Sequence, residues 1–322
     1  MSMNINDNIP TVAVICGPTA TGKTRLSVEL ARSFDGEIVS ADSMQVYRRM
    51  DIGTAKATPD ERCGVPHHMI DVAEPSEQYS VARYVEEASA CTDDILARGK
   101  LPLIVGGTNL YIDSLLSGRD FASAAGEDPE LRAELERRYD ELGGEEMLRQ
   151  LRVFDPERAE KLPPTDRRRI IRAFEVYRLT GKSLSEHDRE TRLAPPRYRA
   201  AVIALDYLDR EHLYARINDR VDEMVRLGLF EEEVKALQSE GLNPDCTAMQ
   251  AIGYKEPLSA LRGEITRDEA IELIKRESRR YAKRQLTWLR RKEGLLWIRH
   301  GQTPDFLEAR RLSTEYLRSF GL

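Results

Sequence analysis

An apolar run followed directly by a glycine-rich loop is the feature that most restricts how this chain can fold. The run, VAVIC at residues 12–16, has the composition of a buried strand, and GPTATGKT follows it at residues 17–24. Leu26, Leu30 and Phe34 then recur at four-residue intervals, which indicates a helix over 23–34. A strand, a Gly-x4-Gly-Lys-Thr loop and a helix, in that order, are typical of a phosphate-binding loop.

The chemistry of this loop suits a diphosphate or triphosphate. Its glycines let successive backbone N–H groups turn inward, and the start of the following helix adds partial positive charge. Lys23 supplies a full charge, and the Thr24 hydroxyl is a candidate Mg²⁺ ligand. The alternative is a Gly/Thr-rich turn that fits the pattern by chance. The predicted phosphate-binding residues are Gly17, Pro18, Thr19, Ala20, Thr21, Gly22, Lys23 and Thr24.

Further strand and helix patterns predict an α/β protein. Short apolar segments at 37–41, 101–107, 201–207 and 295–298 have the character of strands, and 80–98 has the period of an amphipathic helix. Strands that alternate with helices form a parallel sheet covered by helices. From 121 to 196 no buried strand is evident. We therefore expect a P-loop NTPase-like core (1–120 and 197–322) with an inserted all-helical domain (121–196).

The acidic residues at the strand ends bear on the reaction. The strand at 101–107 continues into Gly107-Thr108 without the acid that would hold Mg²⁺ for ATP hydrolysis. Asp42 follows the strand at 37–41, and the carboxyl ends of parallel strands line one crevice, so Asp42 should face the loop. Two interpretations stay open: a general base or indirect metal partner, and a cap of the next turn.

Basic residues are concentrated in one segment of an acidic chain. The net charge is −6, yet residues 275–292 hold nine Lys or Arg and one Glu. Like charges four residues apart on a helix repel, so a phosphodiester backbone is a natural partner for them. A second cluster, RRRIIR, lies at 167–172. The alternative is pairing with acids elsewhere in the fold. If the first segment is a helix, about half of its circumference carries the cations Lys275, Arg276, Arg279, Arg280, Lys283 and Arg284.

The remaining potential metal or redox residues carry less information. His67 and His68 have no third ligand at suitable spacing, which favours loop and packing roles. The four cysteines are far apart and are interpreted as reduced thiols in the cytosol. We expect neither a signal peptide nor a membrane span, since no apolar run is long enough.

Several motifs together resemble the tRNA dimethylallyltransferases, also called tRNA isopentenyltransferases. Besides GPTATGKT they are ADSMQVYRRMDIGTAK (41–56), VPHHMIDV (65–72), VGGTNLY (105–111), AIGYKE (251–256) and KRQLTWLRR (283–291). They occur in order from residue 12 to about residue 291, and the second is the most specific. Thr21 stands where Ser is expected, and Met44 where many members have Arg or Ala. The zinc-finger extension of eukaryotic members is absent, which indicates the bacterial type.

The resemblance implies that the loop binds dimethylallyl diphosphate and that the diphosphate is a leaving group. The dimethylallyl group would be transferred, with Mg²⁺ present, to N6 of the adenosine immediately 3′ of the anticodon (position 37) in tRNA. Asp42 would orient N6 and accept its proton, while Thr24 and Lys23 neutralise the departing diphosphate. Arg220 matches a family arginine that contacts the diphosphate, with Arg216 as the alternative.

The resemblance also implies contacts with the anticodon stem-loop, in which the inserted domain would take part. We expect a monomer in the cytosol. The implied tRNA-binding residues are Asp42, Ser43, Met44, Gln45, Thr108, Arg132, Arg168, Arg169, Ile170, Ile171, Arg172, Gln250, Gly253, Tyr254, Lys255, Lys283, Arg284, Gln285, Trp288 and Arg290.

Two other functions compete with this one. A P-loop small-molecule kinase would use ATP, with residues 121–196 as its lid, and the missing acid and the basic segment count against it. A non-catalytic RNA-binding protein would use the loop only as a ligand site that supports folding.

Overall fold

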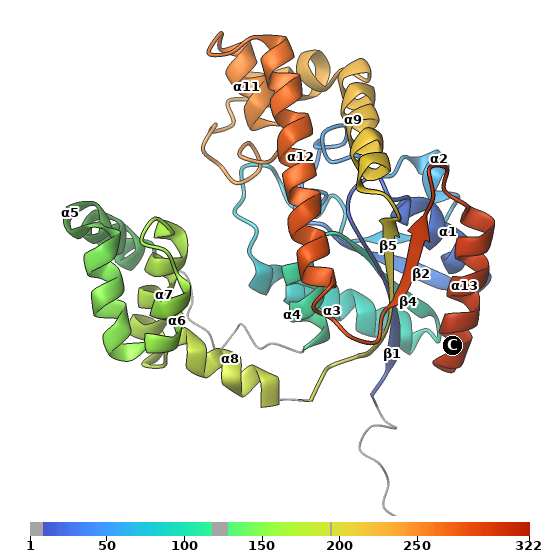
Figure 1. Cartoon of the computed structure of the whole chain (residues 1–322), viewed down its shortest axis with the longest axis horizontal. Coiled ribbons are helices and arrows are strands. Elements are labelled where there is room, and N and C mark those ends of the chain that lie inside the picture. The colour runs from blue at the N-terminus through green and yellow to red at the C-terminus, as the bar shows by residue number, and fades with distance from the viewer. Residues whose placement is uncertain (1–8, 118–127, 194) are drawn as a thin grey trace, which may run out of the picture. The chain divides into compact units, whose positions relative to one another are not determined.

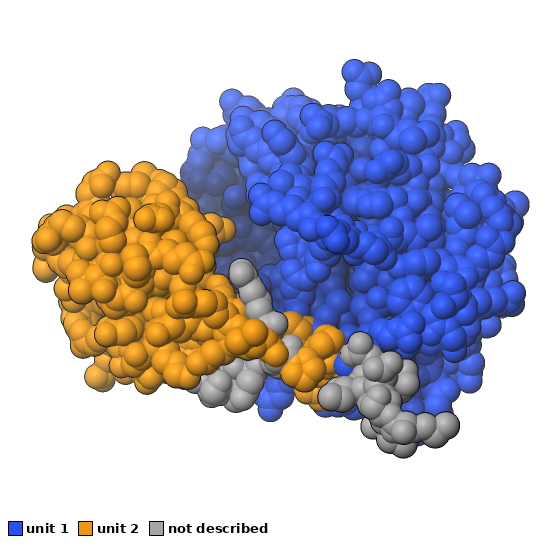
Figure 2. Space-filling model, turned by 60° about the horizontal axis from the view of Figure 1, so that its bottom comes forward, with its two compact units in different colours: residues 1–116, 198–322 blue, residues 117–197 orange. Residues whose placement is uncertain are grey.

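The chain forms two compact units (Figures 1 and 2), and the computed structural model describes residues 9–117, 128–193 and 195–322. Unit 1 comprises residues 1–116 and 198–322, and unit 2 comprises residues 117–197. The expected start of the insertion, at 120–121, lies outside the described residues.

Unit 1 is built on a six-stranded sheet in the order β3-β2-β4-β1-β5-β6, and all the strand pairs are parallel. β1 lies between two neighbours and is covered on both faces, so Val12, Ala13, Val14 and Ile15 are fully buried and their run does not alternate with polar residues. The predicted parallel α/β fold is confirmed. The strands are β1 (Thr11–Cys16), β2 (Gly36–Ala41), β3 (His67–His68), β4 (Leu101–Gly106), β5 (Arg199–Tyr207) and β6 (Leu296–His300).

Helices cover both faces of the sheet (Figure 1). On one face, α1 (Lys23–Ser33) and α13 (Phe306–Ser319) contribute Leu26, Leu30 and Leu317 to a core shared with Ile15 and other strand residues. On the other face lie α3 (Val81–Ala97) and α4 (Asn109–Leu116). Tyr84 of α3 and Tyr111 of α4 stack there with ring centroids 3.9 Å apart, which ties the two helices together.

A group of helices lies beyond the carboxyl ends of the strands (Figure 1). The longest, α12 (Arg267–Leu289), begins at a capping box formed by Thr266 and Glu269, and it packs along α9. The others are α9 (Arg210–Arg226), the π-helix η2 (Leu229–Val234), α10 (Lys235–Ser239) and α11 (Lys255–Leu261). A short helix, α2 (Pro59–Arg62), precedes β3.

The described residues of unit 2 form helices around their own apolar core. Gly143, at φ +76°, interrupts α5, and a Cβ on Gly144 would lie 1.9 Å from the carbonyl oxygen of Pro164. The core includes Leu135, Met147 and Leu151. The helices are α5 (Pro129–Phe154), α6 (Pro156–Lys161), α7 (Arg167–Thr180) and α8 (Leu184–Leu193).

The histidine pair corrects one expectation. His67 and His68 form the short edge strand β3 rather than a loop, because their backbone pairs with Ile38 and Val39 of β2. The His68 ring packs beside Glu37, with 2.8 Å between Nε2 and Oε2. In the part of the chain that the structure describes, no helix is long and apolar enough to cross a membrane.

Candidate active site

The phosphate loop joins β1 to α1 and depends on two glycines. Gly17 has φ +146°, and a Cβ there would lie 2.5 Å from the carbonyl oxygen of Leu205 in β5. Gly22 has φ +84°, and a Cβ there would lie 2.3 Å from the ring of Phe306. The backbone can therefore curl against β5 and α13 only without side chains at these positions, and α1 begins directly behind it at Lys23.

Lys23 is in one electrostatic neighbourhood with Arg220 and Asp42. Its ammonium donates to the carbonyls of Gly17 (3.0 Å) and Pro18 (2.7 Å), which leaves one of its three N–H donors for a ligand. Burial lowers the pKa of Lys23 to about 8; the Arg220 charge acts in the same direction and the Asp42 charge opposes it. Three parts of the chain that are distant in sequence thus meet at the loop.

Asp42 caps the turn that follows β2. Its Oδ1 accepts hydrogen bonds from the backbone N–H groups of Met44 (2.9 Å) and Gln45 (3.3 Å), as the capping interpretation expects. Its Oδ2 accepts no hydrogen bond from the described residues. The cap therefore uses one carboxylate oxygen, and the second is left for a substrate.

The turn after β4 connects the Asp42 turn to α12. The Thr108 Oγ1 accepts a hydrogen bond from the Ser43 N–H (3.0 Å), and the Gly107 carbonyl accepts one from Gln285 Nε2 (2.8 Å). A Cβ on Gly106 would lie 2.1 Å from the carbonyl oxygen of Ala41. Since β4 lies between β2 and β1, the Asp42 turn and the phosphate loop flank this turn on either side.

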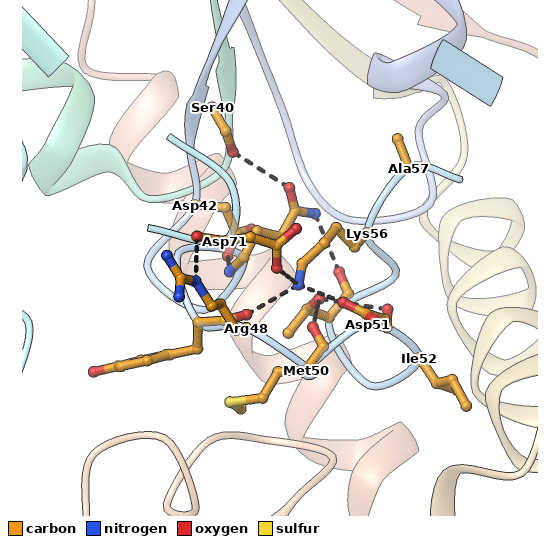
Figure 3. A network of polar contacts seen from close by, with 12 residues as sticks. Ser40, Asp42, Arg48, Met50, Asp51, Ile52, Lys56, Ala57 and Asp71 are labelled. Atoms are coloured by element: carbon orange, nitrogen blue, oxygen red, sulfur yellow. Dashed lines mark hydrogen bonds and ion pairs between the residues drawn. The ribbon is translucent and has the colours of Figure 1, made fainter. Parts of the chain in front are cut away.

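A buried lysine organises the rest of the segment that follows β2 (Figure 3). The Lys56 side chain is 3% exposed and donates to the Tyr47 carbonyl (2.9 Å) and Asp71 Oδ1 (2.7 Å), and it also pairs with Asp51. These contacts fold residues 47–56 back on themselves. The sequence alone had not indicated this role for Lys56.

Gln45 is a second organiser of that segment. Its Oε1 accepts from the Ser40 hydroxyl (3.3 Å), and its Nε2 donates to the Thr54 carbonyl (3.2 Å). The side chain expected to contact tRNA therefore holds the segment 40–54 together.

Arg220 of α9 also contacts this segment. Its Nη2 donates to the Ala55 carbonyl (3.3 Å), while its Nε is buried and has no partner among the described residues. Burial lowers the pKa of Arg220, and the charges of Glu61 and Asp42 oppose that shift. A buried guanidinium N–H without a partner is a position where a bound anion would be stabilised.

Arg216, the alternative to Arg220, is exposed and lies next to Tyr207. The Tyr207 hydroxyl donates to the carbonyl of Ala20 in the phosphate loop at 3.5 Å. Both arginines therefore border the loop, and Arg220 is the less exposed of the two.

Two acidic residues were missed by the sequence analysis. Asp206 is the penultimate residue of β5, which pairs with β1. Its Oδ1 accepts from the Tyr207 N–H (2.8 Å), and its Oδ2 lies 3.9 Å from Arg290. Burial raises the pKa of Asp206. Glu233 is buried in η2 and binds backbone N–H groups near the site. The spacing of Phe230, Glu233 and Leu237 on one helical face was the available signal for its burial.

The loop provides a suitable ligand for Mg²⁺. Mg²⁺ keeps water and phosphate oxygens as ligands and needs few protein groups. Thr24 is the second residue of α1, and its hydroxyl is the group of the loop that could hold such a metal. Across 9–117, 128–193 and 195–322, no three His, Cys, Asp or Glu side chains are grouped as a metal cage.

The basic segment is divided by the fold. Lys275 pairs with Asp222 (2.8 Å) and Arg279 bonds to Asn218, so these two cations pack against α9 and do not belong to a free basic face as expected. The carboxyl-terminal half of α12 instead borders a surface hollow of about 450 Å³. Its lining residues are Arg280, Lys283, Arg284, Thr287, Trp288 and Arg291.

Other expected tRNA contacts in unit 1 differ in exposure. Tyr254 and Gln285 are buried and bonded to Glu233 and Gly107, so their side chains are not surface groups, and their expected contacts with tRNA stay predictions. Gly253 is buried as well and adopts φ +90°. Gln250, Lys255 and Arg290 are exposed.

In unit 2 the expected contacts are largely engaged within the unit. Ile170 and Ile171 are buried in its core, so only their backbone is left for the expected contact with tRNA, which stays a prediction. Arg168 is exposed. The ion pairs in this region are Arg167 with Asp140, Arg169 with Asp166 (3.4 Å), and both Arg132 (3.1 Å) and Arg172 (3.4 Å) with Glu175.

Two family models match the chain. A model described as IPP transferase matches residues 45–292, which is more than half of the chain, and one described as isopentenyl transferase matches residues 10–72. Together they span the phosphate loop, the Asp42 turn and α12.

Proteins described as tRNA dimethylallyltransferases are similar to this chain over nearly its full length. A tRNA dimethylallyltransferase of Acetivibrio thermocellus is 47% identical over 311 residues, covering 97% of this chain and 98% of the relative. That of Bacillus licheniformis is 50% identical over 294 residues, covering 91% and 92%.

Solved structures similar to this chain come from proteins of the same family as these relatives. The tRNA isopentenylpyrophosphate transferase of Bacillus halodurans superposes with a TM-score of 0.70 at 42% identity, covering 96% of this chain and 97% of the other. A eukaryotic dimethylallyltransferase acting on tRNA gives a TM-score of 0.80 at 30% identity, covering 96% and 80%.

Proposed function

Because the chain belongs to the tRNA dimethylallyltransferase family, we propose that it transfers a dimethylallyl group from dimethylallyl diphosphate to N6 of the adenosine immediately 3′ of the anticodon. The resemblance seen in the sequence is confirmed at the level of the family. The observation that carries the proposal for the site is that the phosphate loop with Lys23 and the Asp42 turn follow β1 and β2 at the same edge of the sheet, with Arg220 close enough for its charge to act on Lys23.

The phosphate loop binds the leaving group in this proposal. The diphosphate oxygens accept hydrogen bonds from the backbone N–H groups of the loop from Thr19 to Thr24, from the free donor of Lys23 and from the unpartnered Arg220 Nε. Mg²⁺, held by the Thr24 hydroxyl and the diphosphate, would supply further charge neutralisation. These groups stabilise the negative charge that accumulates on the diphosphate as it departs.

Asp42 is the proton acceptor in this proposal. The N6 lone pair forms a bond to the allylic carbon, the bond from that carbon to the diphosphate oxygen breaks, and an N6 proton passes to Asp42 Oδ2. The bonds from Met44 and Gln45 to Oδ1 hold the carboxylate in place. An exocyclic amine is a weak nucleophile, so a positioned acceptor contributes on the order of 10²–10⁴-fold.

The hollow on α12 is the proposed binding surface for the phosphodiester backbone of the anticodon stem-loop. Arg280, Lys283, Arg284 and Arg291 supply the charge, and Trp288 an aromatic surface. The exposed Arg168 and Arg169 of unit 2 are proposed as a secondary contact. The target base must leave its stack to reach Asp42.

The direct test uses purified protein, undermodified tRNA, dimethylallyl diphosphate and Mg²⁺, without a nucleoside triphosphate. Mass spectrometry of the digested tRNA should show an adenosine that carries the five-carbon group. A tRNA that stays unmodified at micromolar enzyme would falsify the proposal. Phosphoryl transfer from ATP would favour a kinase, and RNA binding without turnover a binding protein. Gel filtration tests the proposal that the enzyme is a monomer.

A further inference from the structure

A single buried carboxylate, that of Glu233, binds three successive backbone amides of the loop at residues 51–53. Its Oε2 accepts from the N–H groups of Asp51 and Ile52, both at 2.7 Å, and its Oε1 accepts from Gly53 at 2.8 Å. Glu233 is 8% exposed and lies in the π-helix η2. π-Helical turns are rare and are frequently found at functional sites.

Tyr254 completes this cluster. Its hydroxyl donates to Glu233 Oε1 at 2.7 Å, and the side chain is fully buried. A Cβ on Gly53 would lie 2.6 Å from the Tyr254 ring, so the ring can close over the loop only because residue 53 is glycine. A carboxylate is an acceptor only, and here its two oxygens receive four donors, which fixes the loop firmly.

The loop that Glu233 holds is connected by hydrogen bonds to Arg220, the proposed diphosphate ligand, and to the turn of Asp42, the proposed proton acceptor. Two residues beyond Gly53, the Ala55 carbonyl accepts the bond from Arg220 Nη2. The Thr54 carbonyl accepts from Gln45, whose backbone N–H in turn bonds to Asp42 Oδ1. A shift of residues 51–53 would therefore move the Ala55 carbonyl that holds the Arg220 guanidinium. It would also move the Thr54 carbonyl that holds Gln45 and, through it, the Asp42 turn.

We propose that Glu233 is a positioning residue for transfer: it fixes the 51–55 loop and thereby aligns Arg220 with the diphosphate and Asp42 with the amine. This inference rests on the proposed function. Glu233 touches neither substrate in this scheme, and it acts through the carbonyls of Thr54 and Ala55.

Glu233→Gln is the variant that tests the role with little change in volume. Its amide group would turn an N–H₂ donor toward backbone donors, so at least one bond is lost and another is opposed. We expect the affinity for inorganic pyrophosphate, measured by calorimetry, to fall about tenfold or more, as for other supporting residues. The KM for dimethylallyl diphosphate should rise and kcat should fall, while the KM for tRNA stays unchanged.

Glu232→Gln is the matched control, because Glu232 is the exposed neighbour in the same π-helix. It should leave both affinity and kcat at the wild-type values. Hydrogen exchange at the amides of residues 51–53 should quicken in Glu233→Gln and stay slow in the control. If Glu233→Gln does not fold, Tyr254→Phe removes one of the four donors and should give a smaller change in the same direction.

A double-mutant cycle with Arg220→Met decides whether Glu233 acts through Arg220. If it does, Glu233→Gln should change the pyrophosphate affinity much less once Arg220 is absent. Additive losses would overturn the inference, and so would normal pyrophosphate affinity with unchanged exchange at 51–53. Neither measurement requires prenyl transfer, so a wild-type enzyme that fails to modify tRNA refutes the proposed function and leaves this test intact.

Discussion

Charged side chains are paired where the strands of the central sheet begin (the amino edge) and are partly unpaired where the strands end (the carboxyl edge). At the amino edge, Glu37 at the start of β2 is bonded to Arg98 (2.8 Å), His68 (2.8 Å) and Lys100 (3.2 Å), so its negative charge is matched within the chain. At the carboxyl edge, Lys23 and Arg220 are partly buried and close enough for the charge of one to act on the other, and each keeps an N–H donor without an acceptor among the described residues.

The difference separates structural charge from functional charge. A buried ion is unfavourable unless it is paired, so a matched cluster contributes to the stability of the fold. A group of buried charges without partners is tolerated only when the rest of the fold offsets its cost, and a bound ligand of opposite charge would then pair with it. Changes at the carboxyl edge should therefore alter turnover, and changes at the amino edge should alter unfolding.

The largest effect is expected at Asp42. Asp42→Asn keeps an oxygen that can cap the turn but removes the proton acceptor, so kcat should fall by about 10²–10⁴-fold. The dissociation constant for tRNA should stay within about twofold of the wild-type value. Both are measured with radiolabelled tRNA. Equal losses in binding and turnover would reduce Asp42 to a structural cap.

The next effect is expected at the opposite edge. Glu37→Gln leaves Arg98 and Lys100 without their shared partner, so the free energy of unfolding should drop by about 3 kcal/mol. Urea titration measures that drop. The kcat of the folded variant should equal that of the wild type, and a reduced kcat would show that the two edges are not independent.

The stability contributed by Glu37 should depend on pH in a defined direction. The hydrogen bonds from Arg98 hold the pKa of the Glu37 carboxyl well below its usual range, and His68 and Lys100 act in the same direction. Its stabilisation is therefore complete above the unfolded pKa of about 4.3 and is lost as the pH falls through the lower folded value. The difference between wild type and Glu37→Gln in urea titrations should narrow below about pH 4. A constant difference down to pH 3 contradicts this.

A smaller effect is expected for the α12 hollow. Reversing charge at Arg280 and Lys283 together should weaken tRNA binding about tenfold at low salt and flatten the dependence of log K on log salt by about two units. Filter binding at several salt concentrations measures both. An unchanged slope would mean that this part of α12 does not contact RNA.

The smallest effect is expected in unit 2. Arg169 already pairs with Asp166, the N-cap of its own helix, so Arg169→Glu should change tRNA affinity by only about two- to threefold. The same salt series measures it. A loss as large as that at α12 would make unit 2 an equal partner in binding.

The sheet was predictable because its signal is local. Runs such as VAVIC and LPLIVG are apolar throughout, since both faces of a parallel strand are covered. β3 was not predictable, because two histidines carry no periodicity and their pairing with β2 depends on the fold. The phosphate loop and Asp42 were found because each directly follows a strand.

The supporting contacts of the site could not be predicted in the same way. Asp51 and Glu233 are 182 residues apart, so the sequence indicates at most that Glu233 lies on the apolar face of its helix and not which groups it binds. The partners of Lys275 and Arg279 lie on α9, so the sequence could not show that these two of the six cations of the basic face are occupied. Local patterns identify chemical groups, and only the fold shows which of them are already engaged.

The α12 helix joins two tasks through its own periodicity. Gln285 and Tyr281 reach the Gly107 carbonyl at the floor of the site, while Arg280, Lys283 and Arg284 of the same turns face outward. Adding or deleting one residue between them would rotate one set against the other by about 100°. We infer that residues 280–285 tolerate substitutions far better than an insertion or a deletion. Natural variants should therefore carry different residues here but keep the same number of them.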